Sequence, residues 1–298
     1  MYDSHNILDH RWFNSHRYAL IDAGWRDELP ASWPLTLIAP AFLGEDTARC
    51  PVLLDMHALS RDDLGELLEQ LAEQVASRQD ALCSLLLASQ REPMSVANHL
   101  AQRMVLTLPG ESVRQQLRYF DPATFLQLPR LLGSNGLAWL LDKVESVILP
   151  WAGQWTHVNK PVPDGRTFRL EAEHLAALSR LGVVNRVAMQ MPQPANAQEW
   201  EQACTKIDGH VQRAMVVHGL TQQANLVAFA THALEHHASF DSHPRLSALF
   251  QELRAATPED EIDYRELTSR FTPEDWQQIC MEQQIQGLKS HNKEGIRS

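Results

Sequence analysis

The pattern of hydrophobic and polar positions divides the chain into two parts with different periodicities. In the first part, short apolar runs bounded by turn residues predict buried strands at 17–22, 51–55 and 82–88. Between these runs, apolar residues recur every three or four positions, which predicts amphipathic helices that pack on a flat surface. The first part is therefore expected to be a sheet flanked by helices.

Capping and turn residues place the helix starts and one hairpin in this first part. Ser60, with Asp63 three residues later, predicts the N-cap of a helix. Its inward face is expected to carry the apolar residues Leu64, Leu67, Leu68, Leu71 and Val75. Ser95 is expected to cap a second helix. A Pro-Gly pair between extended stretches at 104–108 and 113–120 predicts a hairpin, so we expect a mixed sheet, parallel at helical crossovers and antiparallel at the hairpin.

The first part ends in a short helix, a strand pair and a linker. Asp121 and Pro122 suit the N-cap and first position of a helix. Extended patterns at 147–151 and 154–158 predict two closing strands. The stretch 159–168 is rich in Pro, Gly and Asp and separates two periodicities, which predicts a linker.

Strand signals disappear after this linker. Helices are expected at 171–191, 197–219, 221–237, 244–254, 264–271 and 273–285, followed by a frayed polar tail from Gly287. The predicted fold class is therefore α+β followed by α. We expect a mixed β-sheet lobe flanked by helices at 1–160 and an all-helical lobe at 161–298.

Composition and charge narrow the classes of partner. Apolar residues make up 44% of the 298 residues and charged residues 21%, which is typical of a globular protein. The net charge is -11, with 13 basic and 19 acidic residues in 1–160 and 13 and 18 in 161–298. Both halves are thus similarly acidic, and phosphate-rich surfaces repel acidic proteins, so we expect neither nucleic acid nor membrane as a partner.

Targeting and cofactor signals also point to a cytoplasmic protein without a cofactor. The first 13 residues are polar and contain no continuous apolar segment of the kind found in signal peptides. The cysteines are Cys50, Cys83, Cys204 and Cys280; they show no CxxC spacing, which predicts reduced, buried thiols. The sequence contains none of the common nucleotide-binding, nucleophile-elbow or HExxH zinc motifs, so we predict that it is not an enzyme.

One catalytic pattern is present and keeps an alternative open. His232, Glu235 and His236 match H-x-x-E-H, in which two histidines one helical turn apart bind zinc and the glutamate activates water. A third ligand is required, and Glu252 and Glu266 are equally placed to supply it. Histidines near a helix C-terminus are also favoured by the helix dipole. We therefore predict that no metal is bound, and a zinc-dependent hydrolase is the alternative.

Two further features suggest contacts with other proteins. Arg118, Tyr119 and Asp121 lie at a predicted strand-to-helix junction, where the structural reading is that Asp121 caps the helix and Arg118 pairs with a nearby acid. Trp25 and Trp33 lie in a polar, proline-containing stretch, and tryptophan is enriched at interfaces. We expect these five residues to contribute to partner binding.

An ordered series of segments resembles the type VI secretion effector-adaptor family, also called effector chaperones. The segments are 18–24, 50–55, 85–89 with His99 and Leu100, Arg118-Tyr119-Phe120-Asp121-Pro122, and Trp151 with Trp155. The resemblance covers most of 17–160 and, more loosely, 200–255, where the family has a helix-turn-helix stretch. One departure concerns a basic residue that the family carries just after Asp-Pro, where this chain has Ala123 and Thr124.

The resemblance implies a non-catalytic adaptor used in bacterial competition. Such adaptors bind a toxic effector in the cytoplasm and load it onto a VgrG-type spike protein for export. An immunity-type inhibitory binding protein is a second alternative, because it shares the acidic and motif-poor character. Neighbouring genes separate these readings, since an adaptor gene is expected between spike and effector genes.

Overall fold

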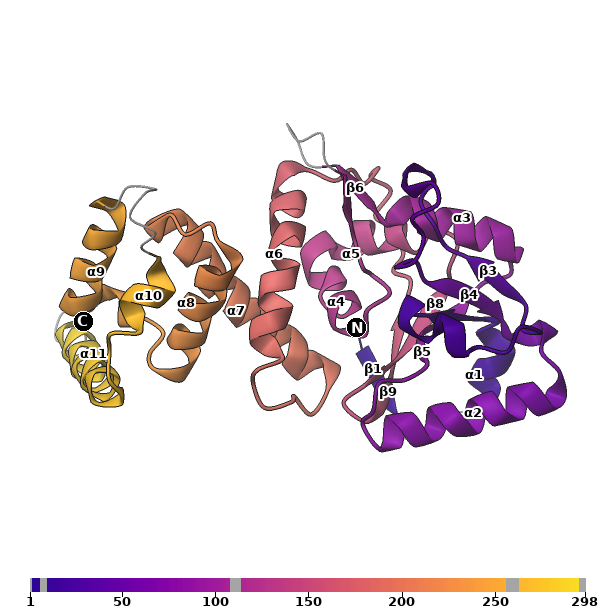
Figure 1. Cartoon of the computed structure of the whole chain (residues 1–298), viewed down its shortest axis with the longest axis horizontal. Coiled ribbons are helices and arrows are strands. Elements are labelled where there is room, and N and C mark those ends of the chain that lie inside the picture. Colours follow the sequence, from indigo (N-terminus) through magenta and orange to yellow (C-terminus); the bar gives the residue numbers. More distant parts are fainter. Residues whose placement is uncertain (1, 6–9, 108–113, 256–262, 295–298) are drawn as a thin grey trace. The chain divides into compact units, whose positions relative to one another are not determined.

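A computed structural model describes residues 2–5, 10–107, 114–255 and 263–294 (Figure 1). The chain forms two compact units, which we call the sheet unit (1–179 and 193–202) and the helical unit (180–192 and 203–298). The expected linker at 159–168 lies inside the sheet unit in this division. The lobe boundary at residue 160 stays a prediction, which limited proteolysis can test.

The sheet unit is built on seven strands in the order β1-β9-β8-β5-β2-β4-β3. Their bounds are β1 Tyr2–His5, β2 Tyr18–Ile21, β3 Leu35–Leu37, β4 Val52–Asp55, β5 Cys83–Ala88, β8 Ser146–Trp151 and β9 Gln154–Asn159. Every residue of β2, β4 and β5 is buried, as their apolar runs predict. The strands β1 and β3 at the two edges were not predicted.

The predicted parallel pairing within this sheet is wrong. All strand pairs in the described parts of the chain are antiparallel. The predicted helix after β4, α2 (Arg61–Ala76), does connect two strands that run in the same direction, β4 and β5. However, β2 lies between them and pairs with both, so the two parallel strands never become neighbours.

Two further strand pairs join strands that are neighbours in the sequence. Strands β6 (Val105–Thr107) and β7 (Arg114–Gln116) pair as a separate two-stranded sheet, while the predicted Pro-Gly turn between them lies outside the described residues. Strands β8 and β9 are joined by Ala152 and Gly153, whose φ angles of 52° and 81° are both positive. Two positive φ angles give the tight turn whose twist matches that of paired strands.

Helices cover the sheet on both sides. The remaining elements are α1 His10–Ser15, α3 Pro93–Arg103, α4 Pro122–Phe125, α5 Leu128–Leu140 and the 3-10 helices η1 Ala23–Glu28, η2 Ala41–Leu43 and η3 Met56–Ala58. Figure 1 shows α2 and α3 on opposite sides of β4 and β5. The start of α2 is as predicted, because Ser60 Oγ accepts a hydrogen bond from the Asp63 N–H at 3.1 Å. Helix α3 instead starts at Pro93, so Ser95 lies inside it and is not its cap.

The helical unit has an aromatic core. Its elements are α6 Ala172–Ala188 and α7 Ala197–His218, which both begin in the sheet unit, then α8 Gln223–Glu235, η4 Phe240–Ser242, α9 Pro244–Ala255, α10 Tyr264–Thr268 and α11 Pro273–Glu294. Phe229 lies at the centre of this core and contacts Phe240, Phe250 and Tyr264. The predicted fraying from Gly287 is corrected, because α11 continues to Glu294.

The predicted fold class is confirmed at the level of its architecture. A sheet with flanking helices occupies the N-terminal region, and the described elements after β9 are all helices. No helix in the described residues is long and apolar enough to cross a membrane.

Candidate partner-binding junction

Asp121 caps the helix that follows the junction, as the sequence predicts. Its backbone is extended, and its carboxylate accepts hydrogen bonds from the Thr124 N–H at 3.2 Å and from the Thr124 hydroxyl at 2.6 Å. Pro122 occupies the first helical position, where its missing N–H costs nothing. Asp121 therefore fixes where α4 begins.

Arg118 is the exposed cation of this junction. Its side chain is 61% exposed, and its Nη2 lies 3.2 Å from Asp22 Oδ2. The guanidinium carbon also lies 5.3 Å from the ring centroid of Phe120, which is buried. A guanidinium carries five N–H donors, so one ion pair leaves donors available for a carboxylate of another protein.

Asp22 connects Arg118 to a second predicted contact residue. The Asp22 carboxylate accepts a hydrogen bond from the Gly24 N–H at 3.0 Å and so caps η1, the short helix that carries Trp25. The sequence predicted an acidic partner for Arg118 but could not identify it, because the two residues are 96 positions apart.

Trp25 and Trp33 are less exposed than the sequence suggested. Both are partly buried and pack against the hydrophobic core between the sheet and α2. The indole N–H of Trp33 is buried and has no hydrogen-bond partner among the described residues. Only part of each ring can therefore meet another protein, and a role in partner binding stays a prediction.

Tyr119 does not offer a binding surface. It is 2% exposed, and its hydroxyl donates a hydrogen bond to the Leu100 carbonyl at 2.9 Å. Burial raises the pKa of this hydroxyl well above its usual range. Tyr119 thus anchors the junction to α3 from inside, and the expectation of a direct contact with a partner needs this correction.

The two residues after Asp-Pro are also internal. Ala123 and Thr124 are 1% and 6% exposed, and the Ala123 carbonyl accepts a hydrogen bond from Trp200 Nε1 at 3.1 Å. The place of the family's second basic residue is therefore filled by small buried side chains. Arg118 is the cation that the described junction presents to solvent.

The H-x-x-E-H residues belong to the aromatic core of the helical unit. His232 Nδ1 lies 2.8 Å from the Tyr264 hydroxyl, and burial lowers the pKa of His232 to about 4. The His236 ring stacks on Trp276, with centroids 4.2 Å apart and planes at 10°. Glu235 is exposed. Within the described residues, the side chains of His232, Glu235 and His236 form no convergent set of metal ligands.

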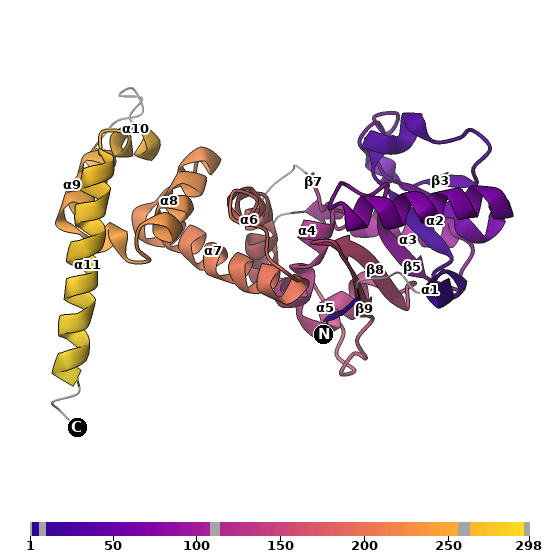
Figure 2. The same cartoon turned by 90° about the horizontal axis from the view of Figure 1, so that it is seen from below.

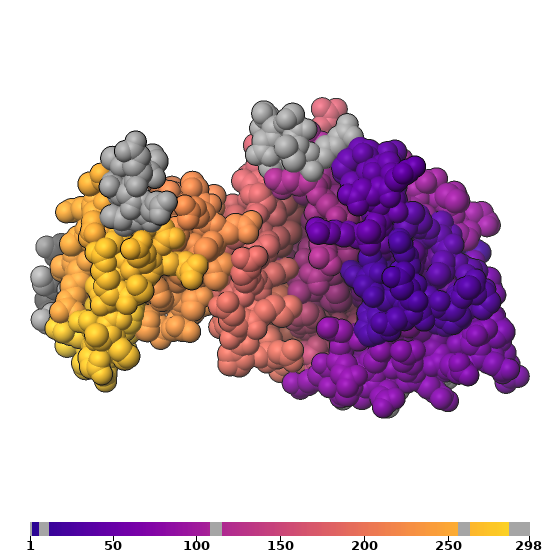
Figure 3. All heavy atoms as spheres, in the orientation of Figure 1, coloured from indigo at the N-terminus to yellow at the C-terminus, as the bar shows by residue number. Residues whose placement is uncertain are grey.

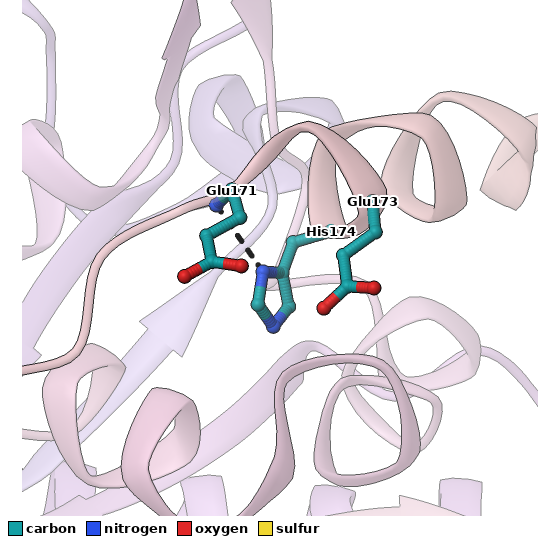
Figure 4. Close-up of side chains that lie close together, drawn as sticks. All are labelled: Glu171, Glu173 and His174. Atoms are coloured by element: carbon teal, nitrogen blue, oxygen red, sulfur yellow. Dashed lines mark hydrogen bonds between the residues drawn. The ribbon is translucent and has the colours of Figure 1, made fainter.

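A different cluster in the sheet unit brings three such groups together. The ligand atoms of Glu171, Glu173 and His174 lie within 4.8 Å of one another (Figure 4). His174 Nδ1, however, accepts a hydrogen bond from the Glu171 N–H at 3.2 Å, as the third residue of a helix does in a capping box. A neutral ring that accepts at Nδ1 carries its proton on Nε2 and has no free lone pair for a metal.

We therefore interpret this cluster as the N-terminal cap of α6. Acidic side chains are stabilised there by the positive end of the helix dipole. Sequence reasoning overlooked it, although a Glu followed three residues later by a His was visible as a signal.

Comparisons of the chain with protein-family models, with curated proteins and with solved structures found no match. The junction around Arg118 is consequently interpreted from its own geometry.

Proposed function

We propose that this chain is a non-catalytic, cytoplasmic adaptor that binds a type VI secretion effector and loads it onto a VgrG-type spike protein. The observation that carries the proposal is the ordered series of five segments that resembles the effector-adaptor family. No single segment is specific, but their order over residues 17–160 is.

The positions of these segments support reading them as one feature. Three of them form the strands β5, β2 and β4, which are neighbours in the sheet. The fourth is the junction, which the ion pair between Arg118 and Asp22 ties to the end of β2. Segments that serve a common surface are expected to meet in space, whereas chance matches have no reason to do so.

The chemistry of the junction suits recognition of a protein carboxylate. Arg118 is exposed and oriented by two contacts, one with Asp22 and one with the Phe120 ring. A pre-oriented guanidinium loses less conformational freedom on binding and forms charge-assisted hydrogen bonds. The exposed parts of Trp25 and Trp33 can add apolar contact area, which typically contributes strongly at interfaces.

Co-expression followed by size-exclusion chromatography tests the proposal. The chain is produced with the effector and the spike protein encoded by neighbouring genes, and complexes are separated at low and moderate salt. We expect co-elution with the effector, the spike or both. If neither partner co-elutes although each is folded, the adaptor function is wrong, and binding to the toxin domain alone indicates an immunity-type protein.

Arg118→Ala tests the junction in the same assay. Arg166→Ala is the matched control, because Arg166 is an 87% exposed arginine of the same unit whose recorded ion pair joins it to its near neighbour Asp164. We expect the Arg118 variant to lose co-elution and the Arg166 variant to retain it. If the two variants co-elute with the partner to the same extent, the junction is not part of the binding surface.

A further inference from the structure

Strand β1 is a short polar strand that covers the outer edge of β9. It lies at the end of the seven-stranded sheet, and Figure 2 shows the N-terminus next to β9. The two middle residues of β1 are exposed. Beyond the ladder, the Tyr2 hydroxyl donates a hydrogen bond to the Leu126 carbonyl at 2.7 Å, and Ser4 Oγ lies 3.4 Å from Thr156 Oγ1. A strand that buries so little apolar surface is expected to open locally before the rest of the sheet.

Strand β9 belongs to the core, and its amides alternate between two neighbouring strands. Trp155, Thr156 and Val158 are 2%, 1% and 0% exposed. A two-residue turn joins β8 to β9, and the ladder continues to Lys160, whose N–H donates to the Glu145 carbonyl at 2.9 Å. In an antiparallel sheet, alternate residues bond to opposite neighbours. The amides of Thr156 and Val158 are therefore directed to β8, and those of Trp155 and His157 to β1.

The His157 side chain lies beside β1 in a cluster of rings. Asp3 is its cross-strand neighbour on β1. The His157 ring centroid lies 6.0 Å from that of Trp12 and 5.8 Å from that of His16, and the His5 ring meets Trp12 at 4.8 Å. His157 Nε2 is buried and has no hydrogen-bond partner among the described residues. A protonated imidazole donates from both nitrogens, so this site favours the neutral ring.

The charges on β1 offset this burial only in part. Burial lowers the pKa of His157, Asp3 raises it by a smaller amount, and His5 lowers it. The Asp3 side chain is 73% exposed, and its Oδ2 lies 3.3 Å from His5 Nε2. Solvent screens an exposed carboxylate, so its attraction for a charged His157 ring is weak.

The other elements around His157 contribute mainly neutral groups. Its cross-strand neighbour on β8 is Ile148. Helix α2, which forms the lower right surface of the sheet unit in Figure 3, packs on the same core through Leu67 and Leu71. The acidic residues on the exposed side of α2 include Glu66, Glu69 and Glu73. Within the described residues, the charged groups that act on His157 are therefore those of β1.

We propose that β1 is an acid-released cover of the β9 edge, and that protonation of His157 favours its release. When β1 leaves, water reaches the His157 ring and can solvate its charged form. Below about pH 6.5, the ordinary pKa of histidine, the open form therefore binds a proton more readily than the closed form, so opening increases as the pH falls. Release uncovers the backbone groups of Trp155 and His157 and leaves the pairing of β9 with β8 in place.

Amide hydrogen exchange of the full chain, followed by NMR, tests this release. The amides of Trp155 and His157 report on β1, and those of Thr156 and Val158 are an internal control on the same strand. We compare about pH 7.5 with about pH 5.0 after correction for intrinsic exchange. The opening constant of the first pair should rise at least about threefold more than that of the second. Equal protection of both pairs at the lower pH overturns the proposal.

Two variants separate His157 from other effects of acid. His157→Gln should abolish the additional rise at the Trp155 amide. His99→Gln is the matched control and should keep it, because His99 is a buried histidine of the same unit whose Nε2 lies 2.9 Å from the Leu140 carbonyl oxygen. A wild-type rise in His157→Gln contradicts the proposal.

Asp3→Asn provides a second test that leaves His157 in place. The change removes the carboxylate that favours the protonated ring in the closed form, so release at about pH 5.0 should exceed that of the wild type. Release that stays at or below the wild-type level contradicts the proposal. These measurements require neither an effector nor a spike protein, so their outcome is separate from that of the proposed function.

Discussion

Arg118 Nη2 lies 3.2 Å from Asp22 Oδ2, across 96 residues of sequence. Each end of this ion pair adjoins a helix start, because Asp22 caps η1 and Asp121, three residues after Arg118, caps α4. The Arg118 carbonyl also accepts a hydrogen bond from the Asp121 N–H at 3.0 Å. The caps depend on the aspartates and the backbone, so the Arg118 side chain can be changed without removing either cap.

Replacing Arg118 by alanine is therefore expected to change stability little. The ion pair joins side chains that are 61% and 36% exposed, and exposed pairs typically contribute about 0–1 kcal/mol. Urea denaturation should show a decrease of less than about 1 kcal/mol in the free energy of unfolding. Binding to a cognate effector, measured by calorimetry, should weaken about tenfold or more. A large loss of stability with unchanged affinity contradicts the assignment of Arg118 to the surface of recognition.

Replacing Asp121 by alanine is expected to affect mainly the stability of the chain, and its affinity for a partner less. The change removes the acceptor of the Thr124 N–H and hydroxyl, and loss of an N-cap typically costs about 0.5–2 kcal/mol. Asp121→Asn is the conservative comparison, because its amide oxygen can still accept from the backbone. Chemical denaturation should rank wild type and Asp121→Asn above Asp121→Ala. Equal stability of all three proteins is incompatible with a working cap.

A buried histidine makes the sheet unit sensitive to acid. His16 is 2% exposed, its Nδ1 lies 3.0 Å from the Trp12 carbonyl, and its Nε2 lies 3.0 Å from Ser146 Oγ. Burial lowers the pKa of His16 from 6.5 to about 4, with a further lowering by nearby His157. The neutral ring can donate from Nδ1 and accept at Nε2, so protonation removes the acceptor that the Ser146 hydroxyl uses.

The sign of the pH effect follows from this lowered pKa. Between pH 6.5 and about 4 the unfolded chain binds the proton more readily than the folded chain, so the His16 contribution to stability falls as the pH decreases. Across that window the loss is expected to reach up to about 3 kcal/mol. Urea denaturation of wild type and His16→Gln at several pH values isolates this contribution. Identical pH slopes for the two proteins show that His16 does not titrate abnormally.

Metal content distinguishes the adaptor from the zinc-hydrolase alternative. His232 is hydrogen-bonded to Tyr264 and His236 is stacked on Trp276, so both rings already have structural partners. We expect elemental analysis of protein purified without a histidine tag to find well under one zinc per chain, whereas a structural or catalytic site holds about one. About one zinc per chain, lost in His232→Ala, supports the hydrolase.

Features determined by neighbouring residues were predictable from the sequence. The caps at Ser60 and Asp121 each involve a contact only three residues away, and both are present. Strands β2 and β4 were recognisable because they are short apolar runs, which only Asp55 at the end of β4 interrupts. Strand β3 was missed because it has three residues and lies between Pro34 and Pro40, and β1 because it is polar and pairs only with the distant β9.

Features determined by tertiary contacts were not predictable in this way. An apolar run indicates that a strand is buried on both faces but not which strands flank it, so the insertion of β2 between β4 and β5 could not be foreseen. The partner of Arg118 likewise depends on how the sheet places β2 beside the junction. The partial burial of Trp25 depends on the core beneath η1, which local polarity does not reveal.

Reconstitution of the complete complex tests the adaptor proposal most directly. The spike protein is immobilised, and retention of the effector is measured with and without this chain, with Arg118→Ala and Arg166→Ala as the paired variants. The proposal predicts that the effector is retained only when the chain is present, and that the Arg118 variant reduces retention while the Arg166 variant does not. Retention that is the same without the chain, or absent with it although all three proteins are folded, contradicts the proposal.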